Sequence, residues 1–394
     1  MKFDFNLYSA LLLPAVIQGI IYAVLLWRRS KAHENKSDFF LSLLCLYSVF
    51  HISQWMLGFA GWYDVKDIHT LFVFYFPFKN WFILGPLLYY FVVTRTNHAF
   101  EFKRKDIFHF IPGLLYYAYA LFCILHDVVW LRLIKRVPLE GFEGTRGYFA
   151  QQNFGILETP ITVLSFLLLI FYIIKSLLHY RGYKEHIINE HSNVEEVSIK
   201  WLRNILYALI SAFILAIIFI IATTFMPNLN YISAWWIYLV WAIITFYISI
   251  AGYNDNSHLN TSIRYSDSIE MKTKVDDRVA DDLPKIDLKK IASQDKSYLK
   301  PNLNLNDFAK QAGIPSAQVS KILNSKYNQN FNEFINTFRI EEVKSKLNAP
   351  NYSHYSILGI ALECGFNSKA TFNRVFKNIT GQSPSAFKKS QIDK

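Results

Sequence analysis

The chain has 394 residues, of which 52% are hydrophobic and 17% aromatic, and its formal net charge is +11. Its three cysteines are isolated from one another, which argues against disulfides and against a cysteine-based metal site. We find no catalytic constellation and no glycine-rich phosphate loop, so we expect neither an enzyme nor a bound metal or cofactor. What remains is a hydrophobic and basic chain, and these two properties fall in different regions of it.

The first 253 residues consist mainly of long apolar stretches. A helix needs about 20 apolar residues to cross a bilayer, and Trp and Tyr gather near the ends of these stretches, as they do at membrane interfaces. The first stretch is expected to remain as an anchor, because its positive charges follow it. We predict seven transmembrane helices, at Phe5–Trp27, Phe39–Trp62, Leu71–Val93, Ile107–Leu125, Phe154–Leu178, Ile205–Phe225 and Tyr231–Tyr253.

Seven spans would place the two termini on opposite sides of the membrane, so a cytoplasmic C-terminus requires an outside N-terminus. The loops then predicted to be cytoplasmic carry 12 Lys and Arg residues and the outer segments carry 6, which agrees with the positive-inside rule. Four of these six lie in a long outer loop expected at Asp127–Asn153. Within it, Val128–Val137 is expected to form a short amphipathic piece at the outer surface, and the loop either contacts a ligand or is a passive crossover.

Polar residues inside predicted spans are candidate functional positions, because they are costly in lipid. Lys79 is the clearest case, since it lies between Pro77 and Pro86 in the third span. His51 and Gln54, about one turn apart in the second span, are candidate partners for it. Together these residues would bind an anionic ligand or form a hinge. Alternatively, Lys79 snorkels to an interface or pairs structurally.

Residues 254–286 have few large apolar side chains and are expected to form a mobile cytoplasmic linker. Beyond them, a helix-turn-helix pattern occurs twice at a constant offset of 52 residues. Each copy has a small residue on its first helix, Ala309 or Ala361, and a glycine four positions later, Gly313 or Gly365, that suits a positive φ in the turn. We expect apolar residues on the second helices to close the cores, namely Val319 in the first copy and Phe372, Val375, Phe376 and Ile379 in the second.

One apolar-periodic helix separates the two copies and ends at Asn348, Ala349 and Pro350. It would let two recognition helices enter successive major grooves on one face of DNA, about 34 Å apart. From Lys285 to Lys394 there are 17 Lys and Arg residues against 8 Asp and Glu residues. Most of the basic excess therefore lies where DNA phosphates would be met. The helix between the two copies has an apolar face, which comprises Phe331, Phe334, Ile335, Phe338, Val343 and Leu347.

Residues from about Asp287 to Lys389 resemble the AraC/XylS family of transcriptional regulators. The stretch FNEFINTFRIEEVKSKL resembles the linker helix of that family, and IALECGFNSKATFNRVFKNITGQSPSAFKK resembles its second helix-turn-helix signature. The family reads DNA with the exposed face of the second helix in each unit. Carried over by position, the resemblance implies Ala317, Ser320 and Lys321 in the first unit and Lys369, Ala370, Asn373 and Arg374 in the second.

We therefore predict an all-α protein with a seven-helix transmembrane domain at residues 1–253 and an AraC-like DNA-binding domain at residues 287–394. The resemblance implies a one-component transcriptional regulator, here in a bacterial inner membrane, whose partners are double-stranded promoter DNA, membrane lipid and an unidentified signal ligand. RNA polymerase and a second copy of the chain are further candidate partners. Two alternatives remain: a transporter or channel-like protein with a regulatory C-terminal domain, and a membrane-anchored DNA tether that senses nothing.

Overall fold

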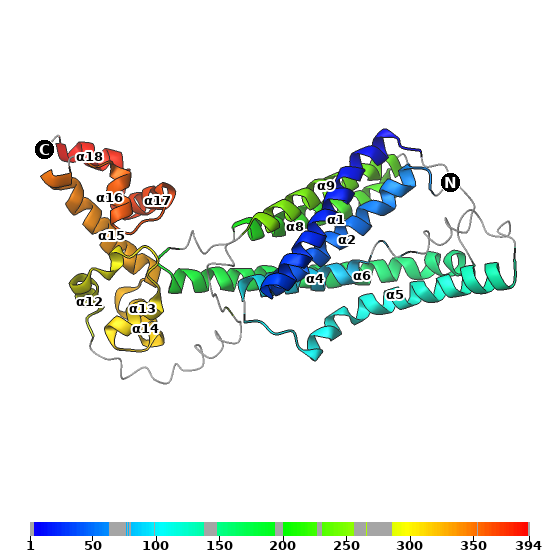
Figure 1. Ribbon diagram of the computed structural model, residues 1–394, viewed down its shortest axis with the longest axis horizontal. Helices are drawn as coiled ribbons and strands as arrows, with labels where there is room; N and C mark the ends of the chain where they lie inside the picture. Colours follow the sequence, from blue (N-terminus) through cyan, green and yellow to red (C-terminus); the bar gives the residue numbers. More distant parts are fainter. Residues whose placement is uncertain are drawn as a thin grey trace. The chain divides into compact units, whose positions relative to one another are not determined.

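Figure 1 shows the computed structural model, in which the chain forms helices. The structure describes residues 4–62, 76, 78, 80–97, 99–137, 148–193, 200–226, 231–255, 265, 286–352 and 354–392. All regular elements among these residues are helical, so the predicted fold class is confirmed. The chain divides into two compact units. Unit 1 comprises Met1–Tyr180 and Ile199–Arg264, and unit 2 comprises Arg181–Ser198 and Tyr265–Lys394.

Unit 1 is a bundle of long apolar helices. Helix α1 packs against α2 and α9, α2 also packs against α4, and α8 packs against α9. Among the described residues, six helices are long and apolar enough to cross a membrane, and they match six of the seven predicted spans. The remaining prediction, Leu71–Val93, lies partly outside the described residues, and its described part includes most of α4. The helices are α1 (Leu7–His33), α2 (Lys36–Phe59), α4 (Trp81–Thr96), α5 (Ile111–Cys123), α6 (Tyr148–Glu190), α8 (Lys200–Phe225) and α9 (Tyr231–Asn254). The residues of α6 from Arg181 onward belong to unit 2.

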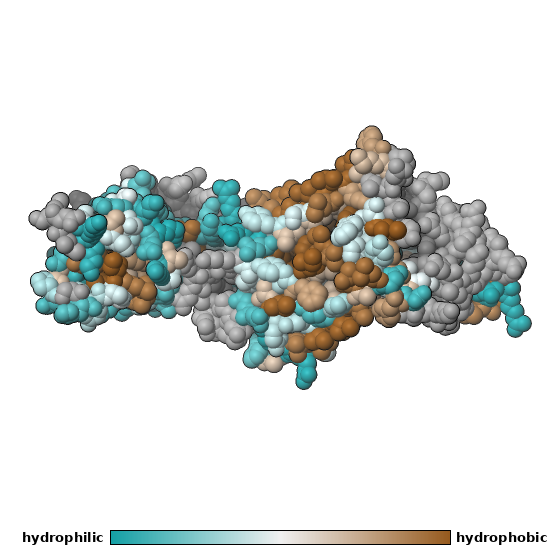
Figure 2. Space-filling view, turned by 90° about the horizontal axis from the view of Figure 1, so that it is seen from above, coloured by the Kyte–Doolittle hydropathy of each residue, from teal (hydrophilic) through white to brown (hydrophobic). Residues whose placement is uncertain are grey.

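The outward faces of the unit 1 helices carry many large apolar side chains. Large side chains such as Ile17, Leu121, Leu167 and Ile218 are about half exposed or more. Figure 2 shows such hydrophobic residues gathered over the helices of unit 1, whereas the visible face of unit 2 is mostly hydrophilic. In water, apolar patches of this extent would be unfavourable, and in a bilayer they cost nothing.

The loop predicted at Asp127–Asn153 is shorter than expected at both ends. Helical structure runs without a break from Arg104 to Ile134, through α5 and a final π-helical segment at Ile124–Ile134, and α6 already begins at Tyr148. The carboxylate of Asp127 lies 2.8 Å from Nδ1 of His126, and Arg132 donates a hydrogen bond to the carbonyl of Val137. The predicted surface piece at Val128–Val137 is therefore mainly a continuation of this helix.

Arg29 and Arg95, which were counted above among the charges of the predicted cytoplasmic loops, form ion pairs near the ends of helices. Arg29 at the end of α1 forms an ion pair with Asp38 of α2, with 2.6 Å between Nε and Oδ2, and also donates to the carbonyl of Gly252 in α9. Arg95 at the end of α4 pairs with Asp255, which also accepts a hydrogen bond from the indole of Trp201 in α8. These contacts join the ends of α1, α2, α4, α8 and α9.

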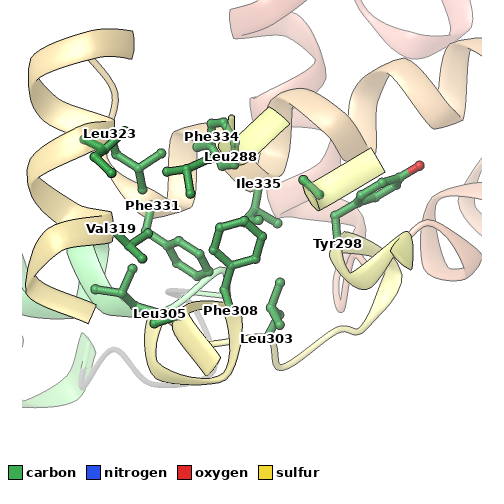
Figure 3. Close-up of a cluster of buried hydrophobic side chains, with 13 residues drawn as sticks. Leu288, Tyr298, Leu303, Leu305, Phe308, Val319, Leu323, Phe331, Phe334 and Ile335 are labelled. Carbon is green, nitrogen blue, oxygen red and sulfur yellow. The ribbon is translucent and has the colours of Figure 1, made fainter. Parts of the chain in front are cut away.

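Unit 2 contains two helical cores that share one long helix, α15 (Phe331–Asn348). Figure 3 shows the first core, where Leu305, Phe308 and Val319 point toward Phe331 and Phe334 of α15. The second core is built around Ile340 and Val343 of the same helix. The other helices are α12 (Leu288–Asp295), α13 (Leu305–Ala312), α14 (Ser316–Tyr327), α16 (Ile357–Glu363), α17 (Lys369–Thr380) and α18 (Pro384–Ile392).

The predicted apolar face of α15 is largely confirmed. Phe331, Phe334, Ile335 and Val343 are at most 1% exposed, and Phe338 is partly buried against the first core. Asn330 is the N-cap of this helix, and its side chain accepts a hydrogen bond from the backbone amide of Glu333. The Glu333 carboxylate accepts one from the backbone amide of Asn330, which completes a capping box. One rigid helix therefore carries both cores.

Candidate nucleic-acid interface

The turns of both helix-turn-helix units form as predicted. Gly313 has φ +67° and Gly365 has φ +91°, so both glycines occupy the left-handed region that the repeated pattern indicated. Each unit also begins its first helix with a polar N-cap: Asn304 accepts from the backbone of Asp307, and Ser356 from that of Gly359. The small residues Ala309 and Ala361 are buried where the two helices of each unit cross.

The repeat offset changes from 52 to 53 residues after the turn, so the prediction of a constant offset is wrong. The buried residues of α14 are Val319, Ile322 and Leu323, and those of α17 are Phe372, Val375 and Phe376, which lie 53 positions later. The second turn is one residue longer, because α14 starts three residues after Gly313 whereas α17 starts four residues after Gly365. Val319 thus corresponds to Phe372 and not to Thr371.

The prediction that Ile379 packs in the second core is also wrong. Its side chain is 42% exposed, whereas Phe376 in the same helix is fully buried. Ile379 lies 53 residues after Lys326, which is exposed on α14. Both residues are near the ends of their helices and fall outside the buried stripe that the three preceding apolar residues define.

The residues predicted to read DNA lie on the outer face of α14 and α17. Ala317 is exposed and Ser320 and Lys321 are half-buried in α14, and the corresponding residues of α17 are exposed. With the corrected offset, the three residues of α14 match Ala370, Asn373 and Arg374 one by one, and Lys369 matches Ser316. Equivalent outer faces in the two units therefore carry all seven predicted residues: Ala317, Ser320, Lys321, Lys369, Ala370, Asn373 and Arg374.

These faces extend one helical turn further than the sequence prediction. Asn324 of α14 and Lys377 of α17 are exposed, lie 53 positions apart, and follow Ser320 and Asn373 by four residues each. Residues spaced by three or four positions share a face of an α-helix. The helical period would have identified both, because it continues the pattern of the residues already named.

A buried arginine contacts both helix-turn-helix units of the C-terminal domain. Arg339 of α15 is 1% exposed, and its Nε donates to the carbonyl of Tyr298 at 2.7 Å and its Nη2 to that of Lys300 at 2.8 Å. Its guanidinium carbon lies 5.8 Å from the ring centroid of Phe366, in the turn of the second unit. Burial lowers the pKa of Arg339 to about 10, which leaves it charged at neutral pH. Arg339 thus links the loop before α13 to the turn before α17.

The candidate ligand residues of unit 1 are only partly described. His51 is buried in α2 among aromatic rings, with centroids of Trp81 at 5.1 Å, Tyr238 at 5.1 Å and Trp241 at 5.2 Å. Gln54 is half-buried on the same helix. Lys79 lies outside the described residues. The structure therefore places His51 in an aromatic box but leaves its predicted pairing with Lys79 untested.

Cys364 lies in the second core of unit 2. It is fully buried, and burial raises the pKa of its thiol to about 11, so the reactive thiolate is strongly disfavoured at neutral pH. In the described part of the chain, no group of three or more His, Cys, Asp and Glu residues could hold a metal ion. Cys364 is therefore part of the packing of this core.

Comparison with known proteins agrees with this geometry. Residues 308–390 match a family model described as a helix-turn-helix domain. An uncharacterized HTH-type transcriptional regulator from Staphylococcus aureus is 34% identical over 91 residues, which are 23% of this chain and 12% of that protein. The Msm operon regulatory protein of Streptococcus mutans is 32% identical over 88 residues, which are 22% of this chain and 31% of that protein. No solved structure matches significantly.

This chain spans 12% and 31% of the length of these two relatives. The family model covers the C-terminal residues 308–390 of this chain. It includes both helix-turn-helix units from Phe308 onward, with the helix α15 between them. The C-terminal domain is therefore an AraC-type helix-turn-helix domain, as the sequence motifs indicated.

Proposed function

We propose that this protein is a membrane-bound, one-component transcriptional regulator that binds specific promoter DNA through α14 and α17. The observation that carries this proposal is the presence, on one chain, of an AraC-type domain and, among the described residues, of six apolar helices long enough to cross a membrane. One relative is named as a transcriptional regulator and another as an operon regulatory protein, which supports a role in regulation over catalysis. DNA binding supplies the output, and the membrane helices supply the control.

Base recognition is assigned to the outer faces of the two recognition helices. Asn373 is exposed, short, and able to pair bidentately with adenine in the major groove. Lys377 is exposed one turn later on α17, and we propose that it contacts a phosphate. The base contact would carry sequence specificity, and the phosphate contact would carry affinity and salt dependence.

Asn373→Ala should relax discrimination at one base pair by about 1 to 3 kcal/mol. Lys377→Ala is the matched comparison, because it should weaken binding to all DNA sequences alike. It should also reduce the slope of log affinity against log salt concentration by about 1. Both residues are exposed, so the melting temperature of the domain should hardly change. Binding of the intact protein to a set of single-base variants of one selected fragment, at several salt concentrations, measures both effects.

The opposite pattern would contradict this assignment. If Asn373→Ala weakens every variant equally, or unfolds the domain, α17 is rotated differently from the orientation that we propose. Salt-independent binding by the unmodified protein would likewise exclude a phosphate-dominated interface.

We further propose that the chain crosses the inner membrane seven times, with its N-terminus outside and its C-terminal domain in the cytoplasm. Among the described residues, six helices are apolar and long enough to cross a membrane, and α4, which lies in the predicted third span, would supply the seventh crossing. The positive-inside bias supports the orientation. A reporter that is active only in the cytoplasm should work when fused after Lys36, Arg104, Glu190 or Lys394, and should fail when fused after Asp64, Gly144 or Asn228. Activity of the Asp64 fusion together with failure of the Lys36 fusion would reverse the first half of this topology.

The signal is proposed to act by allostery. A ligand that binds one arrangement of the membrane helices, or one dimer geometry, more tightly than another would shift the population of DNA-binding-competent molecules. We propose His51, Gln54 and Lys79 as the candidate residues of that ligand site. His51 lies among aromatic rings of α4 and α9. RNA polymerase and a second copy of the chain remain proposed partners.

A further inference from the structure

A short segment that follows α6 in the sequence is built into unit 2. Helix α6 ends at Glu190, and the three residues after it, His191, Ser192 and Asn193, are here called the docking segment. Ser192 is 2% exposed and Asn193 is 7% exposed. These residues belong to unit 2, although they precede α12 in the sequence by about a hundred residues.

The docking segment pairs with the backbone that leads into α13. The amide of Ser192 donates to the carbonyl of Leu303 at 3.1 Å, and His191 forms an antiparallel bridge with Asn304, the N-cap of α13. The Ser192 hydroxyl lies 3.4 Å from the carbonyl oxygen of Pro301. These contacts involve the first helix-turn-helix unit at the loop that Arg339 also binds.

Two polar residues of α15 bind the docking segment directly. Asn332 Nδ2 donates to the carbonyls of His191 at 3.3 Å and Ser192 at 2.7 Å. Arg339 Nη1 donates to the carbonyl of Ser192 at 3.4 Å, and Nη2 donates to its hydroxyl at 3.1 Å. Without the segment, the buried Arg339 would lose two acceptors, and buried donors that lose their partners are costly.

Arg339 connects this segment to the second unit. Its Nε lies only 2.9 Å from the point where a Cβ at Gly365 would be, and its guanidinium lies near the ring of Phe366. A displacement of Ser192 would therefore move or release the side chain that touches both helix-turn-helix units. A fixed arrangement of two recognition helices lowers the cost of binding two adjacent DNA half-sites at once.

We propose that the docking segment is a third part of the DNA-binding domain, which holds Arg339 and thereby fixes the spacing of α14 and α17 for two-part DNA sites. The segment directly follows α6, whose Pro160–Glu190 part is apolar enough to span a membrane. A shift of α6 therefore reaches the DNA-binding domain through this segment, independently of residues 254–286. This inference rests on the proposed DNA-binding function and names the contact through which the membrane helices regulate it.

The first test measures DNA binding by the full-length protein in lipid nanodiscs. The probes are a genomic fragment selected by the unmodified protein and the same fragment with one half-site scrambled. The Ser192→Ala and Asn332→Ala double variant should lose about 25-fold in affinity for the intact fragment, since each substitution removes a buried hydrogen bond worth about a factor of five. Its affinity for the scrambled fragment should stay within about twofold of that of the unmodified protein.

The matched control is Ser293→Ala, which removes an exposed hydroxyl on α12 whose hydrogen bond is local, to the carbonyl of Lys289. It should bind both probes as the unmodified protein does. Unchanged affinity of the double variant for the intact fragment, or an equal loss on both probes, would overturn the inference.

The second test does not depend on DNA. Residues paired across an antiparallel bridge have Cα atoms about 4.5 to 5.5 Å apart, within the range of about 4.4 to 6.8 Å that a disulfide spans. His191→Cys and Asn304→Cys should therefore form a disulfide in oxidised native membranes. Cys45, Cys123 and Cys364 are buried, and the unmodified protein serves as the oxidation control. Failure of the pair to cross-link would overturn the docking itself.

A third variant combines the two tests. In the Asn332→Ala background, the oxidised cysteine pair should restore tight binding to the two-part fragment, and reduction should abolish the gain. No gain on oxidation would show that docking does not control the spacing. If the unmodified protein bound no genomic fragment while the cross-link formed, the proposed DNA-binding function would fail and the docking contact would stand.

Discussion

Replacing Gly365 by alanine should destabilise the second helix-turn-helix unit by about 2 to 5 kcal/mol, as the sum of backbone strain and overpacking. Its φ of +91° costs any L side chain free energy. A Cβ there would also lie 2.8 Å from the carbonyl oxygen of Tyr298 and 2.9 Å from both Arg339 Nε and the carbonyl oxygen of Leu299. Two of these three atoms belong to the backbone, so they cannot simply rotate away.

Gly313→Ala is the matched control. Gly313 has φ +67°, but nothing lies within 4 Å of the position of its Cβ, so only the backbone term of about 1 to 2 kcal/mol applies. Labelling of Cys364 by a maleimide at increasing urea concentration measures the opening of the second core, because this thiol is fully buried. Equal effects of the two substitutions would mean that the turn of the second unit does not pack against Arg339.

Phe376→Ala should cost about 3 to 5 kcal/mol, because it opens a cavity in a close-packed core. The ring is fully buried between Phe372, at 5.5 Å between centroids, and Phe387 of α18, also at 5.5 Å. The free energy of unfolding of the domain, again followed through Cys364, should fall by this amount. Specificity for DNA bases should persist wherever the domain remains folded, because the ring does not lie on the outer face.

Ile379→Ala provides the comparison on the same helix. Its side chain is 42% exposed, so truncation should change stability by less than about 0.5 kcal/mol. A large loss from Ile379→Ala with little loss from Phe376→Ala would show that the buried face of α17 is rotated from the one described here.

The sequence predicted the local features of the DNA-binding domain well. The turn glycines, the small residues at the helix crossing and the apolar face of α15 each follow from a local rule about φ, close packing or helical period. The extra residue in the second turn was not predicted, because Gly313 and Gly365 match at the offset of 52 residues and the extra residue comes after Gly365. Ile379 was misassigned since apolar character near a helix end does not by itself require burial.

The contacts that join distant parts of the chain could not be predicted in this way. Arg339 lies four residues after Ile335 and four before Val343, so helical period places it on the buried face of α15. The pattern does not reveal, however, which carbonyl groups its guanidinium binds. The partners of Ser192 lie more than a hundred residues further along the chain, and no motif relates the two regions. Such long-range polar contacts depend on the three-dimensional path of the backbone, to which short sequence windows are blind.

A genome-wide DNA-binding profile of the intact protein, cross-linked in cells and recovered from the membrane fraction, tests the central claim most directly. We expect a limited set of promoter fragments that share two half-sites about one helical turn apart, which is the geometry of two recognition helices on one DNA face. The Asn373→Ala variant should lose preference at one position of one half-site. Recovery of no fragments above background from the membrane fraction, or of fragments without a shared motif, would contradict a membrane-bound, sequence-specific regulator.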